Sequence, residues 1–202
     1  SVLSTEELST FLQRENFPSE MFFIFFIVCV SAGMRLGEIR GMRKCQFLKD
    51  DKAILIDGFL DRNGNRNNFC KTGSEENPRY RVTLIPDSTV QILNYWIEKN
   101  NLIENDYVFL YDEKPIRTEY AEIIFRRALK NAEIDTTERK ITPHALRYTF
   151  VTRTRRLVGA KVAQDFAGHT SERMTDHYTV FELNETVKQI APLQTKVNAF
   201  FE

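Results

Sequence analysis

Apolar positions along this chain follow the spacing of helices more often than that of strands. The longest apolar run, residues 21–30, begins after Pro18-Ser19-Glu20 and stops before Gly33, so the pattern predicts a buried helix over residues 21–32. This run is about half of the roughly 20 residues that a membrane-spanning helix needs. We therefore interpret it as a core helix and not as an anchor.

Signals at helix ends predict the remaining helices. Ser4 and Glu7 form a capping box before the first one, and Thr142 as N-cap with Pro143 at the first helical position starts a helix that runs to about Leu157. Gly168 ends another helix. The predicted helices begin near residues 5, 21, 35, 87, 118, 143, 161 and 171.

Strand signals are confined to the first half of the chain. Residues 53–57 and 80–85 are rich in β-branched and apolar residues, and Asn63-Gly64-Asn65 marks a turn between them. Strands are expected on both sides of Lys71-Thr72-Gly73. The sum is an α+β fold that is mostly helical, with one small antiparallel sheet in the N-terminal third.

We expect a single domain over residues 1–180 and an amphipathic tail over residues 181–202. The tail is interrupted by Pro192. It either docks on a neighbouring protomer or folds back on its own chain through an apolar stripe formed by Leu193, Val197, Phe200 and Phe201.

The composition fits a folded domain whose charges are unevenly spread. The chain has 202 residues, of which 42% are hydrophobic, with 28 Lys and Arg against 28 Asp and Glu. Residues 139–161 nevertheless hold seven basic and no acidic residues, and residues 35–44 and 62–81 each carry a net +3. If these segments meet in space they form a cationic face for a polyanion; otherwise they are ordinary solvated surface. The three cysteines form no CxxC pair, which favours a reducing compartment.

A pair of polar residues near the start of the helix at residue 143 has the chemistry of a phosphate receptor. His144 and Arg147 are three residues apart and therefore share one helical face. A helix N-terminus adds free N–H groups and a partial positive charge. This spacing is weak evidence when it stands alone.

The pair becomes specific when it is taken with other motifs in chain order. These are Gly33-Met34-Arg35-Leu36-Gly37-Glu38-Ile39, Lys71-Thr72-Gly73, His144-Ala145-Leu146-Arg147, Gly168-His169 and a terminal Tyr178. The set resembles the catalytic domain of the tyrosine recombinases, also called the phage integrase family, over nearly the whole chain. The resemblance implies a catalytic set of Arg35, Lys71, His144, Arg147, His169 and Tyr178, with Glu38 in a supporting role.

The resemblance also implies a mechanism. Two arginines clamp the phosphodiester, Tyr178 attacks phosphorus, His144 accepts the tyrosine proton, and Lys71 protonates the leaving 5′-oxygen. His169 donates to a phosphate oxygen. The intermediate is a 3′-phosphotyrosine. No ATP is implied, because the phosphoryl bond energy is kept throughout, and no metal ion is implied, because the arginines fill the charge role of Mg²⁺.

Several alternatives stand beside these assignments. Lys71 is the weakest match, with Arg79 and Arg81 as competitors, and Glu38 also suits an ordinary i,i+3 partner of Arg35. Tyr148 stands where many relatives have His. The three histidines have no zinc-site spacing. Backbone contacts to DNA are expected from Arg43, Lys44, Arg139, Lys140 and Arg153, which would otherwise be solvated.

The sequence thus predicts the catalytic domain of a site-specific DNA recombinase, an integrase of a bacterial phage or mobile element. A type IB topoisomerase and a non-catalytic DNA-binding module are the alternatives. Expected partners are a double-stranded recombination site and further protomers, with a tetramer on DNA, and no membrane. We expect a cytoplasmic, nucleoid-associated protein without cofactors, whose family's N-terminal core-binding domain is absent from this chain.

Overall fold

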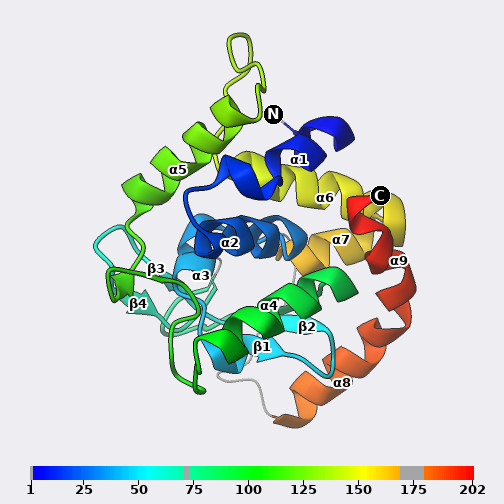
Figure 1. The fold of residues 1–202 in the computed structure, drawn as a ribbon. Helices are drawn as coiled ribbons and strands as arrows, with labels where there is room; N and C mark the ends of the chain where they lie inside the picture. Colours follow the sequence, from blue (N-terminus) through cyan, green and yellow to red (C-terminus); the bar gives the residue numbers. More distant parts are fainter. Residues whose placement is uncertain (1, 71–72, 169–179) are drawn as a thin grey trace.

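The computed structural model describes residues 2–70, 73–168 and 180–202, which form a mostly helical α+β fold (Figure 1). The helices are α1 Thr5–Phe11, α2 Glu20–Ser31, α3 Leu36–Arg40, α4 Asp87–Lys99, α5 Thr118–Asn131, α6 His144–Val158, α7 Ala160–Ala167, α8 Val180–Ile190 and α9 Gln194–Asn198. Short 3₁₀ turns cover Arg14–Asn16 (η1), Lys44–Gln46 (η2), Ala191–Leu193 (η3) and Ala199–Phe201 (η4). The strands are β1 Phe47–Leu48, β2 Ala53–Ile56, β3 Phe59–Leu60, β4 Arg66–Asn67, β5 Arg81–Leu84, β6 Leu110–Tyr111 and β7 Lys114–Pro115.

Helix α2 is the centre of the fold, as its apolar run predicts. It packs against α3, α4 and α6, and most of its side chains are buried (Figure 1). The Ser19 hydroxyl accepts a bond from the Phe22 N–H, and Gly33 follows the helix with φ +60°. A Cβ on Gly33 would lie 2.2 Å from the Phe150 ring, so glycine is required both by backbone conformation and by the approach of α6.

The strands pair differently from the sequence expectation of one small sheet. β1, β2 and β5 form a three-stranded antiparallel sheet in which Ile54 faces Thr83, while β3–β4 and β6–β7 are separate hairpins. The strands on either side of residues 71–73 are therefore not partners. The physical reason is the turn at Gly64, where the Asp61 N–H donates a hydrogen bond to Asn65 O. This turn joins β3 directly to β4, so β4 pairs with β3 and not with β5.

Two helix starts show how far local signals hold. The capping box of Ser4 and Glu7 is confirmed, with both bonds present. Helix α6 begins at His144, one residue later than predicted, and Thr142 supplies no side-chain cap. Instead, the Ala145 N–H donates to Thr142 O and the Leu146 N–H to Pro143 O, so the first turn has the tighter i→i−3 pattern.

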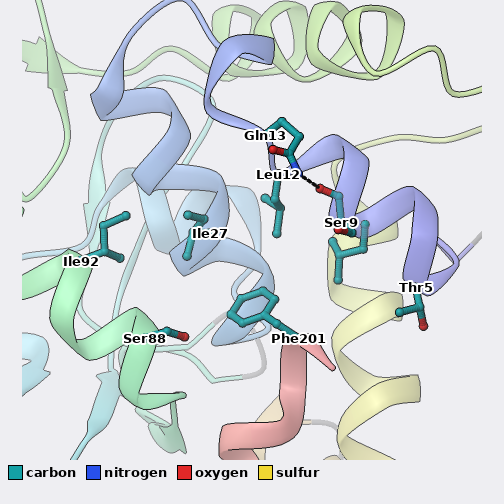
Figure 2. A pocket seen from close by; sticks show the side chains of 9 residues that line it. Thr5, Ser9, Leu12, Gln13, Ile27, Ser88, Ile92 and Phe201 are labelled. Carbon is teal, nitrogen blue, oxygen red and sulfur yellow. Dashed lines mark hydrogen bonds between the residues drawn. The ribbon is translucent and has the colours of Figure 1, made fainter.

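The C-terminal segment lies in cis against the body of the domain in this structure. Val197 and Phe200 are buried, and the Phe200 ring is 5.9 Å from that of Phe150 in α6. Phe201 faces a groove of about 310 Å³ between α1, α2 and α4 (Figure 2). The helix expected after Ser171 lies outside the described residues. Within the described ranges, no helix has the length and apolar character needed to cross a membrane.

Candidate active site

Arg35 stands directly before α3 and is tied to that helix by Glu38. The Arg35 N–H donates to Glu38 Oε2 at 2.7 Å, and its Nη1 donates to Glu38 Oε1 at 3.0 Å. Glu38 is at the third helical position, so its carboxylate reaches back as in a capping box. The i,i+3 pair is therefore present, and it orients the arginine that the resemblance assigns to catalysis.

The Glu38 carboxylate is buried and is held from its other side by Arg81. Nη1 and Nη2 of Arg81 donate to Oε1 and Oε2 of Glu38 at 2.8 and 2.7 Å, a bidentate pair. Burial by itself would raise the pKa of Glu38, but the charge and hydrogen bonds of Arg81, and then those of Arg35, outweigh it and lower the pKa to about 2. The carboxylate is therefore ionised at neutral pH.

Arg81 is not among the site residues that the sequence predicts, where it stands only as a competitor of Lys71. Its side chain is 2% exposed, and its Nε donates to Phe166 O at the end of α7 at 2.8 Å. Burial alone would lower its pKa, but Glu38 raises it above the ordinary value. The available signal was an arginine inside a predicted strand of otherwise apolar character, because such a charge is buried only with a partner.

Arg147 occupies the opposite side of the same cluster. It is 2% exposed, its Nη1 donates to Gly33 O at 2.7 Å, and its Nη2 donates to Ala167 O. Burial, then the charges of Arg81 and Arg35, lower its pKa to about 9, so it remains protonated at neutral pH. With three arginines and one carboxylate, this cluster carries a net charge of +2, which favours binding of an anion.

The hydrogen bonds of the cluster close a ring through four parts of the chain. Glu38 joins Arg35 to Arg81, the last carbonyls of α7 join Arg81 to Arg147, and Gly33 joins Arg147 back to the segment that carries Arg35. Cations at the C-terminus of α7 are also favoured by the helix dipole. The ring therefore holds α3, β5, α6 and α7 in one arrangement.

A cleft lies beside this ring and brings Arg35 and His144 together. Its volume is about 610 Å³, and it is lined by residues of α3, β3, α5 and the start of α6. The exposed His144 ring stands perpendicular to that of Tyr148, with centroids 4.7 Å apart. Arg147 is buried and is not among the described residues that line this cleft.

Three predicted site residues, Lys71, His169 and Tyr178, lie outside the described residues. The chain neighbours of the first two do contact the cluster. Cys70 Sγ is 3.6 Å from Arg81 Nη1, and a Cβ on Gly168, which has φ +67°, would lie 2.8 Å from Arg81 Cδ. The described residues directly before Lys71 and His169 therefore both lie against the Arg81 side chain.

The residues expected to contact DNA are spread over other surfaces, and none belongs to the described lining of the 610 Å³ cleft. Lys44 pairs with Glu104, and Arg139 pairs with Glu7. Arg43 lies 5.5 Å from the centroid of the Tyr107 ring, and Arg153 donates to Phe200 O and Thr5 Oγ1. Lys140 is exposed and, with Arg126, Lys130 and Arg139, lines a second cleft of about 510 Å³.

Comparison with known proteins supplies independent information. The model of the phage integrase family matches residues 2–184. A probable integrase of prophage ps2 from Lactococcus lactis subsp. lactis is 25% identical over 167 residues, which are 77% of this chain and 43% of that protein.

Two solved structures share the fold. The XerA recombinase is 22% identical with a TM-score of 0.63, over 94% of this chain and 63% of that one. The Tn1549 transposon integrase, in complex with transposon right end DNA, is 18% identical with a TM-score of 0.66, over 95% of this chain and 66% of that one. The chain spans less than half of the prophage protein and under two thirds of XerA.

Proposed function

Because this chain belongs to the phage integrase family, we propose that it is the catalytic domain of a site-specific DNA recombinase that works through a 3′-phosphotyrosine intermediate. The observation that carries the proposal is the cluster of Arg35, Arg81 and Arg147 around the single carboxylate of Glu38, beside a cleft that also holds His144. Its net charge of +2 suits a phosphodiester, which carries one negative charge and gains more on attack.

The first chemical step is attack of the Tyr178 hydroxyl oxygen on phosphorus. The new bond joins that oxygen to the 3′-phosphate, and the bond from phosphorus to the 5′-oxygen breaks. His144 takes the tyrosine proton, and Lys71 gives a proton to the leaving 5′-oxygen. A 5′-hydroxyl of a second strand then attacks the phosphotyrosine, so that a bond from its oxygen to phosphorus forms and the bond from phosphorus to the Tyr178 oxygen breaks. The protons return by the reverse route, from the 5′-hydroxyl to Lys71 and from His144 to Tyr178. One phosphodiester bond replaces another, so no ATP is consumed.

The arginines stabilise the charge that develops on the non-bridging oxygens. Arg35 lines the cleft, with a side chain that is 19% exposed. Arg147 uses two of its five N–H donors on described carbonyls, so three remain for other partners. His169 adds a further donor. Because these groups stabilise the developing negative charge, the proposed reaction does not need Mg²⁺.

We propose a double-stranded recombination site as the substrate and a tetramer of recombinase protomers on DNA as the active assembly. Arg43, Lys44, Arg139, Lys140 and Arg153 are the proposed backbone contacts. The tail takes part in assembly, so deleting residues 183–202 weakens multimer formation on DNA. It spares the cleavage step provided that urea titration shows the domain still folded without the buried Val197 and Phe200. Unchanged multimer formation by the truncated chain would refute that role.

The function is tested with a nicked suicide substrate that carries the element's own junction, in EDTA. We expect a covalent protein–DNA adduct on a denaturing gel, mapped by peptide analysis to Tyr178 and lost in Tyr178→Phe. Tyr95→Phe, at an exposed tyrosine of α4, is the matched control that keeps the adduct. An adduct on another residue, or a strict need for Mg²⁺, contradicts the mechanism, and plasmid relaxation without a recombination site identifies a topoisomerase.

A further inference from the structure

Arg81 contributes charge to the cluster but takes no step in the mechanism above, although it contacts Glu38, Cys70 and the end of α7. We propose that Arg81 is a positioning residue that sets the direction of Arg35 by fixing the Glu38 carboxylate between them. The inference deepens the proposed function, and its effect on strand cleavage rests on that function.

The first argument is the geometry of the Glu38 carboxylate. Each of its two oxygens accepts one bond from Arg81 and one from Arg35, at distances from 2.7 to 3.0 Å. The bidentate pair fixes the plane of the carboxylate, because two parallel bonds leave it no rotation. The remaining lone pairs then point toward the backbone and guanidinium of Arg35, which is thereby directed to the cleft.

The second argument is that Arg81 is itself held in place. Its Nε donates to Phe166 O, and its neighbour in the ring, Arg147, takes the next carbonyl, that of Ala167. Gly168 lies so close that an added Cβ would meet the Arg81 side chain at 2.8 Å. The end of α7 is thus the fixed support from which Arg81 acts on Glu38.

Lysine is not an equivalent group at this position. Its ammonium keeps the charge but concentrates three donors on one atom, so it cannot span both carboxylate oxygens and reach the Phe166 carbonyl in one plane. Arg81→Lys therefore preserves the charge of the cluster and removes its geometry. Misplacement of a catalytic group by about 1 Å costs on the order of 100-fold in rate.

The test measures single-turnover cleavage of the suicide substrate at saturating DNA. Urea titration first establishes that each variant is folded. We expect Arg81→Lys to lower the cleavage rate by about 10- to 100-fold, with DNA affinity within about three-fold of wild type. Arg66→Lys is the matched control, because Arg66 is a strand arginine with a main-chain carbonyl and a carboxylate as partners outside the cluster. An unchanged cleavage rate in Arg81→Lys overturns the proposal.

A double-mutant cycle tests whether Arg81 acts through Glu38. If it does, Glu38→Gln/Arg81→Lys cleaves no more slowly than Glu38→Gln alone, because the second change removes an interaction that is already lost. Rate losses that multiply instead overturn the proposal. Should Arg81→Lys not fold, Arg81→Met in the Glu38→Gln background removes the uncompensated buried charge, and the same comparison decides.

A readout independent of cleavage separates this inference from the proposed function. The ¹⁵Nε–Hε NMR signal of Arg35, assigned with Arg35→Lys, is expected to shift and broaden in Arg81→Lys but not in Arg66→Lys. An unchanged Arg35 signal overturns the positioning role. Absence of an adduct with wild-type protein contradicts the proposed function alone, while the NMR result still decides on Arg81.

Discussion

The guanidinium of Arg147 donates a 2.7 Å hydrogen bond to the carbonyl oxygen of Gly33, and this bond ties helix α6 to the turn that ends α2. The turn leads two residues later to Arg35. One arginine of the proposed clamp therefore fixes the backbone segment that presents the other. The remaining bonds of Arg147, Arg81 and Glu38 complete the same unit.

Substitution of Arg147 by lysine should strongly slow the proposed cleavage. Arg147→Lys removes the guanidinium whose two Nη atoms donate to Gly33 O and Ala167 O. We expect the cleavage rate to fall by about 10²–10³-fold, which is typical of removing one preorganised donor. Single-turnover cleavage measures it. The conservative change Arg126→Lys, on the exposed face of α5, is the control, and equal rates for both variants contradict the clamp.

Gly33→Ala should destabilise the fold. Gly33 has φ +60°, and the added Cβ would overlap the Phe150 ring at 2.2 Å, so we expect a loss of about 2–4 kcal/mol from strain and overpacking. Gly64 has φ +87° and open space around it. The Gly64→Ala variant therefore measures the cost of backbone strain alone, without any steric clash. Urea titration of both variants should show the larger loss at Gly33; equal losses would mean that the approach of Phe150 is unimportant.

Acid should remove the stabilisation contributed by Glu38. Its pKa is lowered from 4.5 to about 2 in the fold, so the contribution is complete above about pH 4.5 and is lost as pH falls toward 2. The shift corresponds to about 3 kcal/mol at neutral pH. The stability difference between wild type and Glu38→Gln should therefore shrink between pH 5 and about 2.5; a constant difference over this range contradicts the buried pairing.

The tail should contribute to stability in cis. Phe200 is 2% exposed and packs on Phe150, so Phe200→Ala is expected to cost about 3–5 kcal/mol of unfolding free energy. Phe181→Ala, at a side chain that is 72% exposed, should change it by less than about 0.5 kcal/mol. Urea unfolding of the two variants decides, and an equally small effect at Phe200 excludes docking of the tail on its own domain in solution.

The helices and their ends were predictable because their signals are local. The Ser4 and Ser19 hydroxyls each accept a hydrogen bond from the backbone N–H three residues later, and α2 follows from one continuous run of apolar residues. The strand partners were not predictable in the same way. Whether β4 pairs with β3 or faces β5 depends on a turn that closes on itself and on contacts between distant segments.

By itself, the sequence determined the helical character, the order of the motifs and the chemical types available to the site, because capping, periodicity and motif spacing depend on neighbours along the chain. Only the tertiary structure decided that Arg81 is the counterion of Glu38 and that Arg147 binds Gly33. These partners lie 43 and 114 residues apart. A buried charge takes whichever partner packing brings within reach, and no local pattern encodes that choice.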